Sequence, residues 1–474
     1  MTSELVAGVD IATANARVQI HDPAGNLLAA ASRSLPAPER SGARSEQDAR
    51  SWWPAVRDCL AECTAGLGSR SAEITALAVA ATSGTVVAVD RSGRPLGPAL
   101  MYDDRRAEHE ARIARRAGES RWRRSGITPS AGSGLTRIAH LAHAHPETER
   151  VCHTPEVIGR ELVGHPVPAD TSHALKSGYD VVAEEWASEV FVALEVPERL
   201  LPAVVRPTTP LGRVSAEAAA STGLPRGCEV RAGMTDGCAG QLAAGAVDVG
   251  RFVTVLGTTM VLKGVARELV HDPAGAVYSH LHPEGGWLPG GAAGVGGAAL
   301  ADAAVDELPE LDAAAAARGP ADIVDYPLRG RGERFPFLAP SAEAFRLGTP
   351  VDRVEEHRAR LEGVAFCERL ALERLDELGA TAVGPIRTAG GGARSAVWCG
   401  IRASVLGRPV LRVREAGTAL GAALLAAAGT VHPDLSTAAR SMVPAAESVE
   451  PAPDERLEIN YQRFRSELRD RGWI

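Results

Sequence analysis

The sequence predicts an α/β protein of two lobes. Two segments of the same strand–turn–strand type lie roughly half a chain apart, at residues 4–21 and 251–262. A strand-rich start is followed by mixed helix and strand patterns, which is typical of α/β folds. With 474 residues the chain has room for about two to four domains, and the repeated turn favours two large lobes.

The first turn follows an apolar strand at residues 4–9. A second apolar run lies at 17–21, and residues 22–26 form a further turn signal. Asp10 and Thr13 therefore fall in a hairpin turn. A carboxylate there can hold hydrated Mg²⁺, and a hydroxyl with backbone N–H groups can face a phosphate. The alternative is that Asp10 only starts the turn, as aspartates often do.

The second turn repeats this arrangement in the other half of the chain. A strand leads into Gly257 and Thr258, and another strand follows. The pairing of the two turns suggests two related lobes that close on one nucleotide. Gly296, within the glycine-rich segment 289–298, belongs to another loop that permits close approach, and we expect it near the nucleotide.

A third loop carries three consecutive glycines, Gly390, Gly391 and Gly392, before a helix-compatible segment that begins near Ser395. Without Cβ atoms, the backbone can approach a flat or anionic ligand at φ and ψ values closed to other residues. We expect Gly391 to need this freedom. An ordinary glycine turn is the alternative interpretation.

Asp236 lies between the two phosphate-type turns. A short strand enters a glycine-flanked turn that carries this aspartate, and small residues follow at 239–246. Those small residues suit a helix packed closely on its neighbours. The carboxylate is a candidate general base. The alternative is a helix N-cap, a position that aspartate commonly fills.

A long amphipathic helix is expected at residues 355–378. Its apolar residues recur with helical spacing, and Glu368 is the one charged residue on the apolar face. After a Pro- and Ala-containing tail, a final helix is expected at 454–471.

These residues, in this order, resemble the FGGY family of carbohydrate kinases, over a span from Val6 to about Gly429. The resemblance implies the ribonuclease H-like, actin/hexokinase-type fold of that family, with an interlobe cleft. It implies ATP and Mg²⁺ as cofactors. Asp10 and Asp236 would hold the ion, directly or through water, and Asp236 would accept the proton of the attacking sugar hydroxyl.

The resemblance assigns the remaining site residues one by one. The cofactor-binding residues are Thr13, Gly257, Thr258, Gly296, Gly390, Gly391, Gly392 and Ser395. The substrate-binding residues are Asp10, Ser83, Asp103, Asp104 and Asp236. Residues 415–423 resemble the family's C-terminal helix signature. The sequence departs from the family pattern at Ala12, Tyr102 and Ser404, which stand where many relatives carry Gly, Trp and Asp.

The segment 82–85, Thr-Ser-Gly-Thr, differs from the Gln-Met-His-Gly type found in many xylulokinases. Together with 100–104 and 326–336, it resembles the ribulose-phosphorylating, xylulokinase-like branch of cyanobacteria and plants. This resemblance implies a pentulose substrate, with D-ribulose ahead of D-xylulose. Ser83 can hydrogen-bond a ketose hydroxyl, or it can cap a turn.

We expect a sugar-binding lobe at 1–245, a nucleotide-binding lobe at 246–431 and a C-terminal tail and helix at 432–474. Several alternatives remain open: a sugar-alcohol or other ketose kinase, a non-sugar ATPase such as a chaperone or filament protein on the same fold, and an inactive sugar sensor. The presence of Asp104 and Asp236 favours a kinase, because a chaperone needs neither.

Composition agrees with a soluble cytoplasmic enzyme, and the resemblance implies a small-molecule sugar as its partner. The formal net charge is −8, and no long basic run with interleaved aromatics appears, so no nucleic-acid partner is expected. The nearest candidate, residues 115–124, is interpreted as a solvated helix face. Neither a signal peptide nor a membrane span is evident. A homodimer is left open.

Overall fold

The computed structural model describes residues 4–414 and 417–474. The described chain forms two compact units. Unit 1 comprises the residues up to Gly245 with His280–Gly285 and Gly417–Val443, and unit 2 comprises Ala246–Ser279, 286–414 and Pro444–Ile474. These units differ from the expected division, because residues 417–431, which we placed in the second lobe, pack within unit 1.

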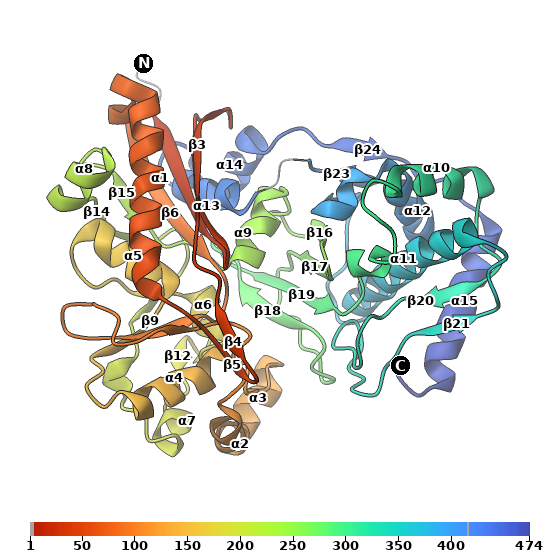
Figure 1. Ribbon diagram of the computed structural model, residues 1–474, viewed down its shortest axis with the longest axis horizontal. Coiled ribbons are helices and arrows are strands. Elements are labelled where there is room, and N and C mark those ends of the chain that lie inside the picture. Colours follow the sequence, from red (N-terminus) through yellow and green to blue (C-terminus); the bar gives the residue numbers. More distant parts are fainter. Residues whose placement is uncertain (1–3, 415–416) are drawn as a thin grey trace. The chain divides into compact units, whose positions relative to one another are not determined.

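Unit 1 is built on a six-stranded sheet of order β14-β15-β6-β1-β2-β3 (Figure 1). Its strands are β1 (Leu5–Ile11), β2 (Asn15–His21), β3 (Leu27–Ser34), β6 (Ile74–Ala81), β14 (Pro210–Arg213) and β15 (Glu229–Arg231). β1 pairs antiparallel with β2 and parallel with β6, which in turn runs parallel to β15. The predicted hairpin is therefore confirmed, but Asp10 lies within β1, paired with Arg17 of β2, and not in the turn, which contains Thr13.

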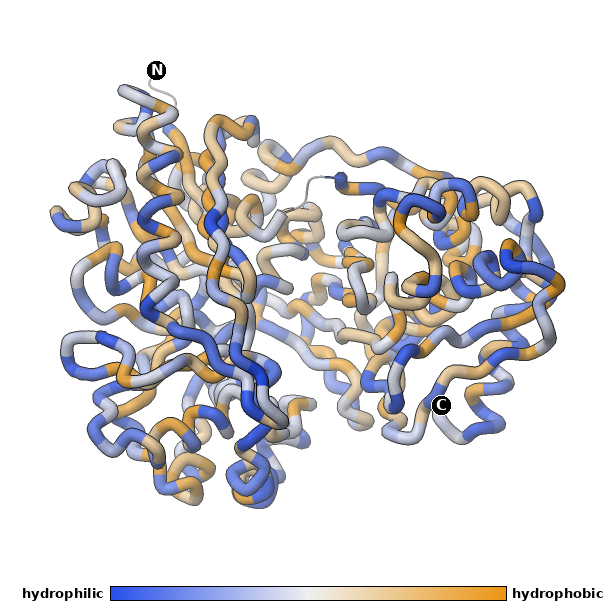
Figure 2. Tube along the Cα trace, viewed as in Figure 1, coloured by the Kyte–Doolittle hydropathy of each residue, from blue (hydrophilic) through white to orange (hydrophobic). Residues whose placement is uncertain are grey.

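Helices cover both faces of this sheet. α1 (Trp52–Leu67) packs on β2 and β3, and α13 (Thr418–Ala427) packs on β1 and β6. Every residue of β1 is buried, as expected of a central strand covered on both faces. A Cβ at Gly8 would lie 1.8 Å from the carbonyl oxygen of Ala419, so this glycine is what lets α13 approach β1. Figure 2 shows hydrophilic and hydrophobic positions interspersed along α1.

The small residues after Asp236 have the predicted role. Ala239, Gly240 and Ala243 lie on α9 (Asp236–Ala243), which packs against α13, and residues 244–246 follow the end of the helix. A Cβ at Gly421 of α13 would lie 1.9 Å from the carbonyl oxygen of Ala239. The two helices therefore meet through residues without bulk. Of the family-like signature at 415–423, residues 415 and 416 lie outside the described residues.

A second sheet of unit 1 has the strand order β4-β5-β8-β7-β9. Its strands are β4 (Glu39–Ser41), β5 (Arg44–Gln47), β7 (Val86–Val89), β8 (Ala99–Leu100) and β9 (Arg150–His153). Two short pairs join β10 (Ala169–Asp170) to β13 (Val204–Val205) and β11 (Tyr179–Asp180) to β12 (Glu185–Trp186). The remaining helices are α2 (Glu108–Ala117), α3 (Glu119–Ser125), α4 (Gly134–Ala144), α5 (Thr154–Val163), α6 (Thr171–Leu175), α7 (Ser188–Ala193), α8 (Ala216–Thr222) and α14 (Leu435–Met442).

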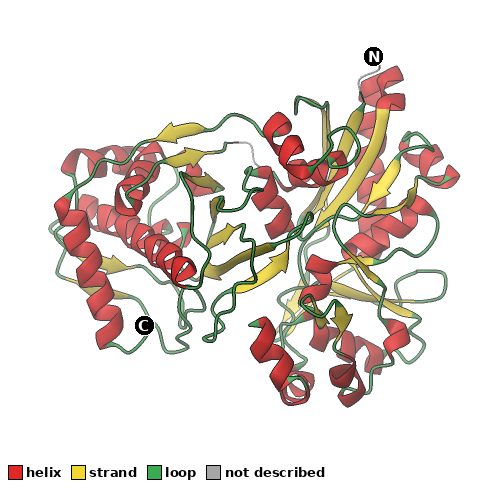
Figure 3. Ribbon diagram, turned by 180° about the vertical axis from the view of Figure 1, so that it is seen from behind, coloured by secondary structure: helices red, strands yellow, loops and turns green. Residues whose placement is uncertain are grey.

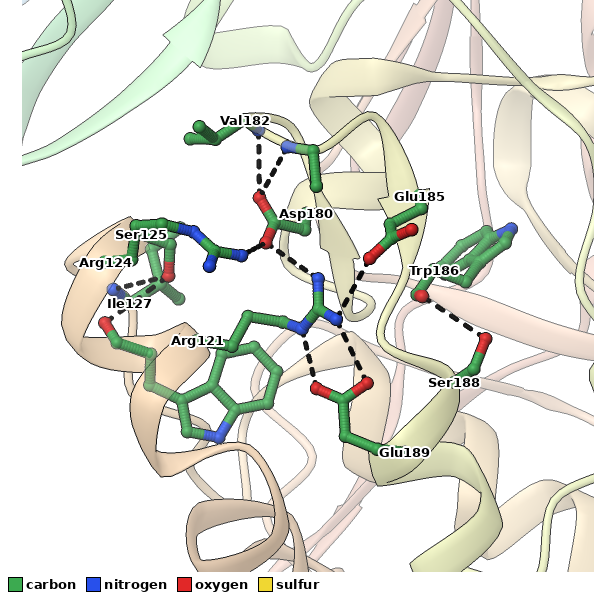
Figure 4. Close-up of polar contacts among 12 residues, drawn as sticks. Arg121, Arg124, Ser125, Ile127, Asp180, Val182, Glu185, Trp186, Ser188 and Glu189 are labelled. Carbon is green, nitrogen blue, oxygen red and sulfur yellow. Dashed lines mark hydrogen bonds and ion pairs between the residues drawn. The ribbon is translucent and has the colours of Figure 1, made fainter.

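The arginine-rich segment of α3 is engaged within the protein (Figure 4). Arg121 makes ion pairs with Asp180 at 2.8 Å, Glu189 at 2.7 Å and Glu185 at 3.2 Å, and Arg124 also pairs with Asp180. The Arg121 side chain is only 12% exposed. The expectation of a solvated face is therefore wrong at this position, because carboxylates from β11, β12 and α7 fold over it.

The sheet that carries most of unit 2 repeats the strand plan of unit 1, in the order β18-β19-β17-β16-β22-β23-β24, and the last two residues of β18, 280–281, are grouped with unit 1. Its strands are β16 (Phe252–Leu256), β17 (Met260–Gly264), β18 (Tyr278–Leu281), β19 (Trp287–Ala293), β22 (Ile386–Ala389), β23 (Val410–Arg412) and β24 (Glu447–Val449). β16 pairs antiparallel with β17 and parallel with β22, as β1 does with β2 and β6. The predicted repeat of the hairpin is confirmed.

The helices of unit 2 pack beside these strands (Figure 3). They are α10 (Leu308–Arg318), α11 (Arg353–Glu377), α12 (Ala396–Leu406) and α15 (Glu455–Asp470), and a short pair joins β20 (Val324–Tyr326) to β21 (Phe345–Leu347). The two helices predicted at 355–378 and 454–471 are confirmed within two residues. Among the described residues, no helix has the length and hydropathy needed to cross a membrane.

Candidate active site

Three strand ends gather the predicted site residues of unit 1. β1, β6 and β15 run parallel, so their carboxyl ends meet at one edge of the sheet, where α/β proteins commonly bind ligands. Asp10 stands opposite Ala80, and Ala81 forms a parallel bridge with Thr235. The turn 82–85 follows Ala81 directly, and Asp236 follows Thr235. The sheet register thus brings Asp10, Ser83 and Asp236 to the same edge.

The side chain of Asp10 is buried, and only one of its two carboxylate oxygens has a hydrogen-bond partner among the described residues. Its Oδ2 accepts a hydrogen bond from Nη1 of Arg17 at 3.1 Å, whereas its Oδ1 is buried with no hydrogen-bond partner among the described residues. Burial raises the pKa of Asp10 to about 6, the Arg17 guanidinium opposes that shift, and the Asp236 carboxylate adds to it. A buried oxygen without a partner, within electrostatic reach of a second carboxylate, fits a divalent cation.

Arg17 was not among the predicted site residues. It stands directly opposite Asp10 in the β1–β2 register. A signal for it exists in the sequence, because a hairpin with a turn at residues 12–14 pairs position 10 with position 17. The composition of the turn gives no such signal, because it carries no information about the strand register beyond it.

Asp236 is the first residue of α9, and Thr235 occupies the N-cap position. The alternative in which Asp236 is the N-cap is therefore wrong. Its Oδ1 accepts a hydrogen bond from the backbone N–H of Gly237 at 2.7 Å, and the side chain is partly exposed. A carboxylate in the first helical turn is stabilised by the helix dipole. It remains accessible to a ligand at the sheet edge.

The turn 82–85 carries two buried hydroxyl groups. Oγ of Ser83 and Oγ1 of Thr85 are buried and lack a hydrogen-bond partner within the described chain. Buried hydroxyls are usually bonded, so an unpartnered pair in a loop is a candidate for ligand contact. The interpretation of Ser83 as a turn cap finds no corresponding bond in the described residues.

Arg137, on α4, ties this turn to the segment that follows β8. It is 1% exposed and donates to the carbonyl oxygens of Gly84, at 2.7 and 3.1 Å, Tyr102, at 3.2 Å, and Asp104, at 2.9 Å. Burial lowers its pKa to about 10, and Asp104 and Asp103 oppose the shift. The bonds fix two loops that are far apart in sequence.

The two neighbouring aspartates differ in accessibility. Asp104 is fully buried, and its oxygens accept hydrogen bonds from the backbone of Ser45 at 2.7 Å and from Arg106 at 2.6 to 3.2 Å. Asp103 is partly exposed and accepts from Arg40 at 3.0 Å. Asp104 therefore anchors its loop in this structure, and direct substrate contact by either residue stays a prediction.

In unit 2 the glycine-rich loops gather at one sheet edge in the same way. Val255 pairs with Ala389 in the parallel β16–β22 register, so Gly257 and Gly390 follow neighbouring strand ends. The backbone N–H of Gly297 donates to the carbonyl oxygen of Gly257 at 2.7 Å. A Cβ at Gly296 would lie 2.5 Å from the carbonyl carbon of Thr259. Three loops thus pack against one another, and Gly257 and Thr258 are exposed.

The three consecutive glycines have different structural requirements. Gly390 has φ +85°, and a Cβ there would lie 2.8 Å from the carbonyl oxygen of Leu256. A Cβ at Gly392 would lie 2.4 Å from Cδ2 of Leu256, whereas the nearest atom to a Cβ at Gly391 is 4.0 Å away. The expectation that Gly391 needs glycine's backbone freedom is wrong. Gly391 is instead exposed and open to a ligand.

Ser395 is the N-cap of α12. Its Oγ accepts from the backbone N–H of Trp398 at 3.0 Å and donates to Oδ2 of Asp312 at 2.6 Å. His357 bonds the other oxygen of Asp312 at 2.7 Å. The sequence did not point to Asp312 or His357, because neither belongs to a recognisable motif. A cofactor contact by Ser395 stays a prediction.

Metal ligands are few. Within residues 4–414 and 417–474, no group of three or more His, Cys, Asp or Glu side chains could hold a metal ion. Mg²⁺ in kinase sites is commonly held by one or two carboxylates together with water and substrate phosphates. Asp10 and Asp236 are compatible with that kind of site.

The repeated sheet, with candidate site residues at one edge of each copy, is the architecture expected of the carbohydrate kinases that the sequence resembles. The FGGY family of carbohydrate kinases, N-terminal domain, matches residues 5–243, and its C-terminal domain matches residues 252–430. The chain belongs to the FGGY family of carbohydrate kinases.

Individual relatives agree with this assignment. A xylulose kinase of Streptomyces coelicolor is 30% identical over 481 residues, covering 98% of this chain and 96% of the relative. The crystal structure of xylulose kinase from Rhodospirillum rubrum matches with a TM-score of 0.88 at 28% identity and covers 98% of this chain and 99% of that chain. Plasmodium falciparum glycerol kinase with ADP shares the fold, with a TM-score of 0.87 at 16% identity over 100% of this chain and 99% of that chain.

The protein is therefore a carbohydrate kinase, a phosphotransferase that acts on a small-molecule sugar. The chaperone and filament alternatives are excluded by the family.

Proposed function

We propose that this kinase transfers a phosphoryl group from ATP, with Mg²⁺, to a terminal hydroxyl of a pentulose. The observation that carries the proposal is the edge of the unit 1 sheet. Asp10 lies near the end of β1, Ser83 and Thr85 follow β6, and Asp236 follows Thr235. Among the described residues, Oδ1 of Asp10 and the hydroxyls of Ser83 and Thr85 have no hydrogen-bond partner. A carboxylate pair and free hydroxyls suit an ion and a polyol.

Each residue has an assigned part. Asp236 accepts the proton of the attacking hydroxyl, because it is partly exposed at the start of α9. Asp10 and Asp236 hold Mg²⁺, which when bound neutralises charge on the phosphates. Phosphoryl transfer depends mainly on positioning and charge neutralisation. Thr13, Gly257 and Thr258 serve the phosphates, and Gly296, Gly390, Gly391, Gly392 and Ser395 serve the rest of the nucleotide.

Within the pentuloses we place D-ribulose ahead of D-xylulose. The turn 82–85 supports this order, because it differs from the segment found in many xylulokinases and offers two buried hydroxyls. A pocket that pairs each hydroxyl rejects a wrong epimer, since a misplaced hydroxyl leaves buried partners unsatisfied. Two curated relatives at 30% identity are named xylulose kinase, which supports the opposite order.

An ADP-release assay over a panel of ketoses, alditols and glycerol, with and without Mg²⁺, tests the proposal. We expect Mg²⁺-dependent, sugar-dependent ADP release, with the largest kcat/KM for D-ribulose. D-xylulose in first place would correct only the order of the pentuloses. Glycerol or a hexulose in first place would refute the pentulose assignment, and ATP turnover of equal rate without sugar would refute sugar phosphorylation.

A further inference from the structure

The buried carboxylate of Asp170 belongs to a hydrogen-bond network that reaches the sheet edge carrying Ser83 and Asp236. Asp170 ends β10 and is the N-cap of α6. Its Oδ1 accepts from the backbone of Ser172 at 2.8 Å and of His173 at 3.0 Å, and from the Ser172 hydroxyl at 2.6 Å. Its Oδ2 accepts from Nδ1 of His173 at 2.6 Å. Asp170, Ser172 and His173 are 3%, 0% and 0% exposed, so these hydrogen bonds are shielded from solvent.

Ser172 and His173, which are bonded to Asp170, each also contact the backbone at the end of a strand. Oγ of Ser172 accepts the backbone N–H of Thr235 at 2.8 Å. Nε2 of His173 lies 3.3 Å from the carbonyl oxygen of Ala81. Because a carbonyl only accepts, Nε2 carries a proton, while Nδ1 donates to Asp170. The imidazole is therefore held as a double donor.

The surroundings of His173 stabilise this form. Burial has the largest single effect and lowers the pKa of His173, but the carboxylates of Asp170, Glu156 and Asp236 together outweigh it, so the pKa is raised. The ring of His153 lies 5.7 Å away, and its own nitrogens bond Glu156 and Ser177.

Ala81 and Thr235 are bridge partners on neighbouring strand ends. Ala81 leads into the turn of Ser83, and Thr235 leads into Asp236. We propose that Asp170 is a positioning residue that fixes the spacing between the sugar-contacting turn and the general base, acting through His173 on the turn and through Ser172 on Asp236. This inference rests on the proposed function of Asp236 and Ser83.

The two arms predict separate kinetic effects. Ser172→Ala removes the acceptor of the Thr235 N–H and loosens Asp236, so kcat should fall about 10- to 100-fold, the effect of a misplacement of the order of 1 Å. His173→Asn removes the bond to Ala81 and loosens the turn, so the KM for the sugar should rise up to about tenfold, as for one lost hydrogen bond. The KM for ATP should stay unchanged in both variants. Ser172→Thr, which keeps a hydroxyl, should restore kcat.

Thr64→Val is the matched control. It deletes a buried hydroxyl that bonds the carbonyl oxygen of Thr222 at 2.7 Å, between α1 and α8 of the same unit. It should lower the melting temperature without separating kcat from the sugar KM. The inference would be overturned if Ser172→Ala and His173→Asn both changed kcat and the sugar KM in the same way as the control does.

Two further comparisons keep the test decisive. If Ser172→Ala does not fold, Ser172→Thr and Ser172→Cys are compared, because a hydroxyl is a strong acceptor and a thiol a weak one at the same site. Equal kcat values in these two variants would overturn the inference. Asp236→Asn serves as the reference. Retained turnover in Asp236→Asn refutes the proposed base itself. Loss of turnover in Asp236→Asn with an unchanged kcat in Ser172→Ala refutes only the positioning role.

Discussion

Arg402 and Glu368 form a bidentate ion pair in unit 2, with Nε and Nη2 of the guanidinium each 2.6 Å from a carboxylate oxygen, and both side chains are fully buried. Nη1 of Arg402 also donates to Thr388 at 2.7 Å, and Thr254 donates to Glu368 at 2.5 Å. The pair thus joins α11 and α12 to β16 and β22, the strands whose ends lead into Gly257 and Gly390.

Arg402→Met should destabilise the protein by about 3–5 kcal/mol, because it leaves the Glu368 charge buried without its partner. The loss is measured as the change in free energy of unfolding in urea. The matched control is Arg353→Met, whose pair with Glu307 is 56% and 45% exposed and should contribute less than about 1 kcal/mol. The double variant Arg402→Met/Glu368→Met should recover much of the loss. Equal costs for Arg402→Met and the control would contradict this account.

Gly391→Val should weaken binding of a non-hydrolysable ATP analogue and leave sugar binding and the melting temperature intact. The reason is that Gly391 is exposed and has space for a Cβ within the protein. Gly390→Ala is the comparison: its φ of +85° and the nearby Leu256 carbonyl oxygen predict a loss of stability above about 1 kcal/mol. Calorimetric titration with each ligand decides. Unchanged affinity for the analogue in Gly391→Val would remove this loop from the nucleotide site.

Asp236→Asn should reduce kcat by about 10²–10⁴-fold, with the fold and ATP binding largely retained, because asparagine cannot accept the hydroxyl proton. If Asp236 only favours the start of α9, the change costs about 0.3–1 kcal/mol of stability and leaves turnover intact. Glu217→Gln, in the exposed first turn of α8, is the matched control for that helix effect. Steady-state kinetics with melting curves separates the two. A variant that melts normally and keeps more than about a tenth of kcat would end the catalytic assignment.

The rate at low pH should report Asp10. With a pKa raised to about 6, its carboxylate is protonated as the pH falls through that value, so kcat/KM should decline on the acid side near pH 6. Arg17→Gln removes the neighbouring charge that lowers this pKa, and the decline should move to higher pH. Arg33→Gln on β3, whose arginine pairs with Glu62, is the control and should leave the midpoint in place. If the midpoint of the acid-side decline in kcat/KM does not move in Arg17→Gln, the decline is not caused by protonation of Asp10.

The sequence alone determined the features that depend on local chemistry. The two strand–turn–strand segments, the helix at 355–378 and the close packing after Asp236 follow from hydrophobic period, turn residues and side-chain size over short windows. The family also followed from local motifs, because each motif keeps its spacing within a single turn or loop.

Tertiary structure decided which distant residues meet. Glu368 was visible as a charge on an apolar face, but its partner Arg402 lies 34 positions away on another helix. Arg17 is a neighbour of Asp10 because of the hairpin register. Asp170 is connected to both Ala81 and Thr235, through His173 and Ser172, because the strand ends that carry them lie side by side.

The same reason explains the corrections. Which of three adjacent glycines needs a positive φ depends on where the carbonyl oxygen of Leu256 falls, and the burial of Arg121 depends on carboxylates nearly sixty or more residues away. Residues 417–443 join unit 1 because α13 offers small side chains that fit Gly8 and α9. Local propensity carries no information about such pairings, since their energy arises only when packing has excluded water and fixed the register.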